Sequence, residues 1–196
     1  MLSIKNVKVY DLKESVIACR NAMRLEIPEY TDEEFEKSLV RMKKLVQASK
    51  IGVVKCHDNA LTGIRVSFDL IYPQYISPEL QRYHFIDIVT SSSKMHRLCK
   101  MDMRKACNEY VDERLMNIEQ EHINKYNENP CYDTFIRMVS NCPMGLELFM
   151  RCSTNYKQLQ TIYFQRIHHK LKEDWGAFCK FIESLPYAKE LIICDN

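Results

Sequence analysis

Alternation of apolar and polar residues predicts three extended stretches in this chain. The stretch 64–72 alternates most regularly and is expected to be a buried β-strand. Its apolar face holds Ile64, Val66, Phe68, Leu70 and Tyr72, and its polar face holds Arg65, Ser67 and Asp69. The stretch 4–12 alternates well enough for another strand. The stretch 80–89 is expected to be extended again after Pro73 and Pro78 interrupt the chain.

Apolar residues at helical spacing predict a helix over 31–49, where Thr31 and Glu34 match a capping box. Two more helices are expected over 155–169 and 173–184. Strands form the minority in this pattern, which indicates an α/β (α+β) fold. At 196 residues the chain is expected to form a single domain, 1–196.

The serine run 91–93 is expected to cap a long charged helix that continues toward Tyr126. A loop is expected over 127–130. Pro143 and Gly145 predict a turn or short helix that leads into the helix at 155–169. The four glycines of the chain leave little room for a flexible linker.

The net charge of +2 argues against a broad nucleic-acid-binding surface, so any phosphate is expected to bind in a local pocket. No apolar run approaches the ~20 residues of a membrane span. The nine cysteines include no C-x-x-C pair and no signal peptide precedes them. This pattern predicts mostly buried, reduced thiols in a cytoplasmic protein and no metal site.

The predicted helix 155–169 carries an unusual set of polar residues away from its apolar side. These residues are Asn155, Thr161, Gln165, Arg166 and His169. A surface helix would place such groups among many Lys and Glu residues, so this face is a candidate ligand site. The structural alternative is a core network in which the polar groups satisfy one another.

The segment 79–94 is a second candidate. If it is extended, Arg82 and His84 share a face, and the strand leads into a serine-rich helix start near Lys94. Backbone N–H groups, hydroxyls and nearby cations together make a phosphate cradle. The alternative is a well-capped helix with a solvated lysine.

Two weaker candidates remain. Cys56-His57-Asp58-Asn59 is a polar segment just before the regular strand, where a turn with self-capping side chains is the alternative. Arg137 and Arg151 flank the Pro143 turn, although lone arginines usually lie on solvated faces. The chain has no P-loop, no G-x-G-x-x-G and no Ser-His-Asp order, and no cysteine has a histidine partner at a telling spacing.

Taken together, these segments resemble the flavin-dependent thymidylate synthases, the ThyX family, over roughly residues 50 to 185. Residues 56–63 resemble the family's Gly-His-x-Ser-x-x-Glu-His segment, and 82–94 resembles its Arg-His-Arg-x-x-Ser-x-Asn-Glu-x-Ser-x-Arg motif. Cys142-Pro143 is similar to the family's Leu-Pro turn. The run from Asn155 through Leu159 to Arg166 is similar to its Asn-x-x-x-Leu helix with an essential arginine.

The resemblance implies a ThyX-like fold, a mixed sheet flanked by long helices, and a role for each matching residue. Arg166 would contact the pyrimidine and stabilise charge on its carbonyl oxygen, with Arg82 nearby, and these two are the catalytic candidates. The nucleotide-binding candidates are Glu79, Arg82, Ser92, Ser93, Lys94, Arg137 and Arg166, with Ser92 and Lys94 at the phosphate. The flavin-binding candidates are His57, Tyr83, His84, Thr90, Asn155, Thr161, Gln165 and His169.

The chain also departs from the family pattern. Tyr83 stands for the family's central His, His84 for the next Arg, and Val89-Thr90 for Asn-Glu. Glu79 replaces a Gln of the family. Val139 replaces an Arg, although Arg137 lies close enough in the sequence to take its place. Fewer cations would face the ligands, and Glu79 would repel a phosphate or accept from a cytosine amino group.

The activity that the resemblance implies is methylation of dUMP to dTMP, with methylenetetrahydrofolate as carbon donor, FAD as cofactor and NADPH as reductant. It also implies a homotetramer with active sites shared between subunits. Two alternatives stay open. In the first, the chain is a ThyX-shaped protein that binds a nucleotide without catalysis, for sequestration or regulation. In the second, it is a domain whose polar helix has a purely structural role.

Overall fold

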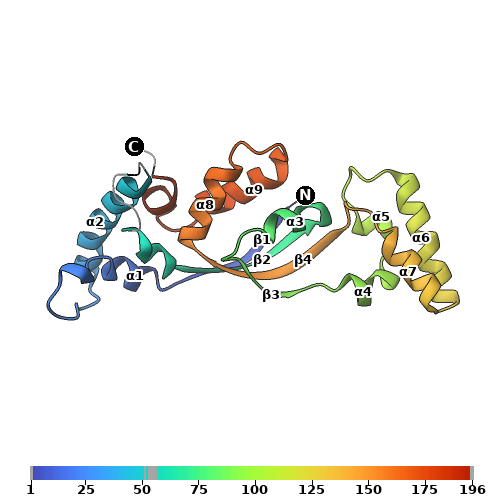
Figure 1. Cartoon of the computed structure of the whole chain (residues 1–196), viewed down its shortest axis with the longest axis horizontal. Coiled ribbons are helices and arrows are strands. Elements are labelled where there is room, and N and C mark those ends of the chain that lie inside the picture. The colour runs from blue at the N-terminus through green and yellow to red at the C-terminus, as the bar shows by residue number, and fades with distance from the viewer. Residues whose placement is uncertain (1, 51, 53–56, 195–196) are drawn as a thin grey trace.

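The computed structural model describes residues 2–50, 52 and 57–194 (Figure 1). Cys56 of the predicted polar segment lies outside these residues. The sheet has four strands in the order β1-β2-β4-β3. Their bounds are Ser3–Tyr10 for β1, Arg65–Pro73 for β2, Asp87–Ser91 for β3 and Glu147–Asn155 for β4.

Every strand pair in this sheet is antiparallel, so the expectation of a mixed sheet was wrong, while the α+β class is confirmed. The helices between β3 and β4 bring the chain back to the end of the sheet that it left, as Figure 1 shows. The chain therefore reverses its direction beside β3. In the register Phe68 faces Cys152, and Ser91 faces Met150.

Helices cover one side of the sheet and both of its ends (Figure 1). α8 and α9 lie together on one side, α1 and α2 gather at one end, and α4 to α7 form a group at the other. Their bounds are Leu12–Ala18 for α1, Asp32–Lys50 for α2, Ser77–Leu80 for α3, Lys94–Arg97 for α4, Met103–Ala106 for α5, Glu113–Glu128 for α6, Tyr132–Ser140 for α7, Tyr156–Arg166 for α8 and Lys172–Glu183 for α9. Within the described residues, no helix is both long and apolar enough to cross a bilayer.

The core lies between the sheet and α9. The apolar side of β2 is fully buried at Phe68, whose ring packs against Phe178 at 5.9 Å and Phe181 at 5.0 Å between centroids. Trp175 and Tyr156 are also fully buried. The predicted elements 64–72, 31–49 and 173–184 are therefore confirmed as β2, α2 and α9, because their apolar periodicity matches the faces that they bury.

Three expectations about secondary structure were wrong. Residues 81–86 form successive tight turns after α3 and are not extended, so Arg82 and His84 do not share a strand face. The long helix expected from Ser91 is broken, because the side chains of Asp102 and Asp112 accept from backbone N–H groups and start α5 and α6. Strand β4 was not predicted, and its last residue, Asn155, caps α8 by accepting from the Gln158 N–H at 2.9 Å.

The expectation of mostly buried cysteines holds in part. Cys152, Cys179 and Cys194 are buried, while Cys131 is exposed at the start of α7. Burial raises the pKa of Cys107 to about 11 and that of Cys152 to about 12, so these thiols stay protonated at neutral pH.

Candidate functional site

A cavity of about 530 Å³ lies between α8 and the turns that precede β3. It is lined by Arg82, Tyr83, His84, Phe85, Gln158, Thr161, Gln165 and Arg166. Two sequence segments that were predicted separately thus meet in space. The structure brings together six of the predicted site residues, namely Arg82, Tyr83, His84, Thr161, Gln165 and Arg166.

The two walls of the cavity are held by local hydrogen bonds. Gln158, Thr161 and Gln165 follow one another at helical spacing, so they share a face of α8. The opposite wall is fixed to the end of β4, where the Thr154 hydroxyl donates to the Phe85 carbonyl oxygen at 2.8 Å. Gln158 and Phe85 were missed at the sequence level, although the spacing of Gln158 from Thr161 was a usable signal.

Three side chains hold Arg166 at the cavity. Its Nε donates to the Tyr83 hydroxyl at 2.5 Å, and its Nη1 donates to Glu79 Oε2 at 3.0 Å. The guanidinium carbon lies 4.3 Å from the centroid of the Trp175 ring, within cation–π range. The side chain is 11% exposed. Arg166 is therefore held in one orientation at the edge of the cavity.

Tyr83 and Glu79 lie on different sides of this guanidinium. Burial raises the pKa of the Tyr83 phenol, while Arg166 opposes that shift, so the hydroxyl is neutral at physiological pH. Glu79 does not line the cavity. Its Oε2 also accepts from the Trp175 indole N–H at 2.7 Å. The carboxylate therefore binds protein groups, whereas the sequence analysis considered it as an acceptor for a cytosine amino group.

Asn155 and His169 lie outside the cavity lining. Asn155 is buried as the cap of α8. His169 follows α8, where its Nδ1 accepts from the Leu171 N–H at 3.2 Å and its Nε2 lies 3.5 Å from Glu79 Oε1. Asn155 thus caps the helix that lines the cavity, and His169 lies beside the carboxylate that binds Arg166.

The residues predicted to bind the phosphate lie at the end of β3 that is remote from the cavity. Ser92 pairs with Phe149, whereas Phe85 is fixed at Thr154, five residues along β4. At the rise of a β-strand this separation is about 16 Å. Lys94 lies just beyond Ser92 and Ser93, with its Nζ 3.5 Å from Gln74 Oε1. One chain therefore does not bring Ser92 and Lys94 to Arg166.

Three further predicted residues lie elsewhere. Thr90 is exposed on β3 opposite Arg151. His57 is exposed and lines a different cavity, beside α2. Arg137 is 62% exposed on α7, where its Nε donates to Asp133 at 2.9 Å. Arg137 thus has the solvated position that is usual for a lone arginine.

The polar segment before β2 also contains an ion pair that the sequence analysis did not predict. His57 is exposed, but the next residue, Asp58, is 1% exposed and accepts from the Lys157 ammonium of α8. No partner for Asp58 Oδ1 lies among the described residues. This ion pair, between a buried carboxylate and a partly exposed lysine, ties the segment to α8. It was missed because no sequence pattern joins positions 58 and 157.

A buried carboxyl lies near Lys94. Glu119 of α6 is fully buried, and neither of its carboxyl oxygens has a hydrogen-bond partner among the described residues. Burial raises its pKa to about 7, and attraction to Lys94 opposes that shift. Glu119 therefore titrates near physiological pH.

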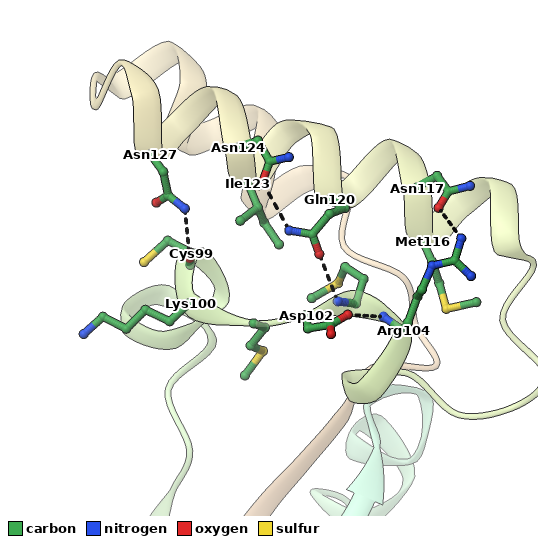
Figure 2. Close-up of a pocket in the computed structure, with 12 residues that line it drawn as sticks. Cys99, Lys100, Asp102, Arg104, Met116, Asn117, Gln120, Ile123, Asn124 and Asn127 are labelled. Atoms are coloured by element: carbon green, nitrogen blue, oxygen red, sulfur yellow. Dashed lines mark hydrogen bonds between the residues drawn. The ribbon is translucent and has the colours of Figure 1, made fainter.

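A second cavity, of about 430 Å³, lies between α6 and the segment 99–104 (Figure 2). Its amides fasten these elements together. The Gln120 side chain accepts from the Met103 N–H at 3.1 Å, and Asn127 donates to the Cys99 carbonyl at 2.9 Å. None of the predicted site residues lines this cavity. Throughout the described part of the chain, no group of three or more His, Cys, Asp or Glu residues is placed to hold a metal ion.

The architecture is that of the ThyX-like proteins. The chain superimposes on thymidylate synthase X from Helicobacter pylori, solved with FAD and dUMP, with a TM-score of 0.73 and 14% identity, covering 98% of this chain and 97% of that one. It also superimposes on the UMP/dUMP methylase PolB from Streptomyces cacaoi, solved with 5-Br dUMP, with a TM-score of 0.66 and 10% identity, covering 99% and 95%. No protein-family model and no curated protein sequence matches the chain. This chain therefore shares its fold with these two proteins, at a sequence identity of 10–14%.

Proposed function

We propose that this chain is a flavin-dependent thymidylate synthase-like methyltransferase that acts on dUMP. The observation that carries the proposal is the cavity at Arg166, where a buried and oriented guanidinium meets an aromatic, hydroxyl and amide lining. Aromatic rings beside a few directed polar groups suit a small ring ligand that carries hydrogen-bonding groups. The similar structures with dUMP, 5-Br dUMP and FAD support the same ligand class.

The cavity lining fits a planar ring that carries hydrogen-bonding groups. Tyr83, His84, Thr161 and Gln165 would hold the flavin ring, and the Arg166 guanidinium would donate to a pyrimidine carbonyl oxygen, where negative charge develops. FAD, when bound, would supply the electrons that convert the transferred methylene to a methyl group. Overall, dUMP, methylenetetrahydrofolate and NADPH with a proton would give dTMP, tetrahydrofolate and NADP⁺.

The nucleotide phosphate would be bound by a second copy of the chain. Ser92 and Lys94 lie at the opposite end of β3 from the Arg166 cavity, so a site that uses all three requires two subunits. This arrangement agrees with the homotetramer and shared sites that the sequence resemblance implies.

A ligand titration tests the proposal. Purified protein is expected to carry or take up FAD, seen as flavin absorbance, and to melt at a higher temperature with dUMP, because a ligand of the folded state stabilises it. Formation of dTMP from dUMP, methylenetetrahydrofolate and NADPH would establish catalysis. Stabilisation by dUMP without flavin uptake would favour a nucleotide-binding protein. Protein that responds to neither ligand would contradict the proposal.

Arg166→Ala is expected to weaken dUMP binding about 10- to 100-fold, the usual cost of losing a hydrogen bond from a charged donor. Isothermal titration of dUMP measures the effect, and a thermal melt of the variant confirms that it folds. The control is Arg114→Ala, since Arg114 is 87% exposed on α6 and pairs with Asp112. Unchanged dUMP affinity in a folded Arg166→Ala protein would remove Arg166 from the site.

A further inference from the structure

The Arg166 guanidinium has one edge left for a ligand. Its Nε donates a hydrogen bond to Tyr83, its Nη1 donates one to Glu79, and the Trp175 ring covers one of its faces. Its Nη2 has no hydrogen-bond partner among residues 2–50, 52 and 57–194. Arg166 lines the cavity and Glu79 does not, so Nη2 is the guanidinium nitrogen that is left for a bound ring.

Glu79 is itself held in place. One carboxylate oxygen accepts from both Arg166 Nη1 and the Trp175 indole N–H, and the other lies 3.5 Å from His169 Nε2. Trp175 is fully buried in α9, so its indole is a rigid donor. Glu79 therefore joins α3, α8 and α9 at a single carboxylate.

We propose that Glu79 is a positioning residue that clamps the Arg166 guanidinium against Trp175 and presents its remaining N–H edge to the ring of the nucleotide. The nucleotide part of this inference rests on the proposed function. These hydrogen bonds fix the direction of the remaining N–H groups of Arg166, so the cavity offers a directed donor. Such a donor suits a neutral carbonyl oxygen, and the phosphate is left to other groups.

The alternative role for Glu79 is a structural cross-link between helices. A cross-link would lower stability when removed but would leave the affinity for a ring unchanged. A positioning residue would change that affinity, and an isosteric amide would restore it, because glutamine keeps an oxygen that accepts from Arg166 and Trp175. The two roles are therefore separable by comparing Glu79→Ala with Glu79→Gln.

The first readout is binding of dUMP and of deoxyuridine, which lacks the phosphate. Glu79→Ala is expected to weaken binding of both ligands at least tenfold and by the same ratio, since a lost charge-assisted hydrogen bond is worth about tenfold or more. Glu79→Gln is expected to bind both ligands within about threefold of the unmodified chain. Glu173→Gln is the matched control, because Glu173 binds the Tyr110 hydroxyl on the exposed side of α9. Unchanged affinities in Glu79→Ala would overturn the inference.

The second readout needs no nucleotide. The chain has a single tryptophan, so one indole N–H resonance reports the Trp175–Glu79 hydrogen bond, and slowly rotating Arg166 Nη groups report the clamp. Glu79→Ala is expected to shift the indole signal and to average the Nη signals, while Glu79→Gln preserves both. If the unmodified chain binds no nucleotide, the proposed function fails, and these signals alone decide whether Glu79 clamps Arg166. Unchanged signals in Glu79→Ala would overturn it.

Discussion

Lys157→Met is expected to lower the free energy of unfolding by about 1 to 3 kcal/mol, because it removes the cation from a buried carboxylate, although Lys157 itself is 37% exposed. Asp58 is 1% exposed and would keep a buried charge with no cation beside it. Urea unfolding measures the loss.

Two comparisons make this result specific to the pair. Lys13→Met removes a lysine whose partner, Asp32, is 97% exposed, and it should cost less than about 1 kcal/mol. The double variant Asp58→Leu with Lys157→Met should recover much of the loss, because no unpaired charge remains. A double variant that is less stable than Lys157→Met alone would show that the pair is not the cause.

Glu119→Gln is expected to make the protein more stable by about 3 kcal/mol at pH 8. The folded state raises the pKa of Glu119 from 4.5 to about 7, so the folded state binds this proton more tightly than the unfolded state. Relative to the glutamine variant, the unmodified chain should therefore lose stability as pH rises from about 4.5 to about 7, and the difference should then level off. The two proteins should converge near pH 4.

Urea unfolding across pH 4 to 8 measures this difference. Glu121→Gln is the control, because Glu121 lies on the same helix but is exposed, and it should match the unmodified chain within about 0.5 kcal/mol. A Glu119→Gln protein that is less stable than the unmodified chain at pH 8 would show that the carboxylate has a favourable partner in solution.

Periodicity predicted those elements whose two faces differ in exposure. β2 is buried at Phe68 and Leu70 but half-exposed at Arg65 and Asp69, so its alternation is plain in the sequence. β4 also alternates, at Met150 and Cys152, but it follows a Pro-Gly turn and runs directly into α8. The helical pattern of α8 begins at Asn155, the last residue of β4, so the preceding strand was not recognised in the sequence.

Helix boundaries depended on caps that compete with one another. The serines at 91–93 were expected to start a long helix, yet none of them caps α4 with its side chain. Asp102 and Asp112 do cap helices, and they divide the stretch into separate helices, of which α4 and α5 are short. Composition alone does not show which of several capping residues the chain uses, because tertiary packing decides between them.

The site was predictable to the extent that local motifs carry it. Arg82 to His84 and the face of α8 were both identified in the sequence, and the fold places them around one cavity. The roles of Glu79 and Trp175 depend on contacts across more than 80 positions, which no local pattern reveals. Burial of Glu119 was equally hidden, since its neighbours in the sequence are those of an ordinary charged helix.

The pairing of Ser92 with Phe149 affects how a mutation at position 92 can be interpreted. The Ser92 hydroxyl oxygen accepts from the Phe149 N–H at 3.0 Å, while the Ser92 N–H donates to the Phe149 carbonyl at 2.8 Å. The side chain thus completes a backbone ladder and keeps its own proton for an outside acceptor. Truncation to alanine would unsettle the strand edge together with any anion contact, whereas threonine would retain the oxygen and isolate the second effect.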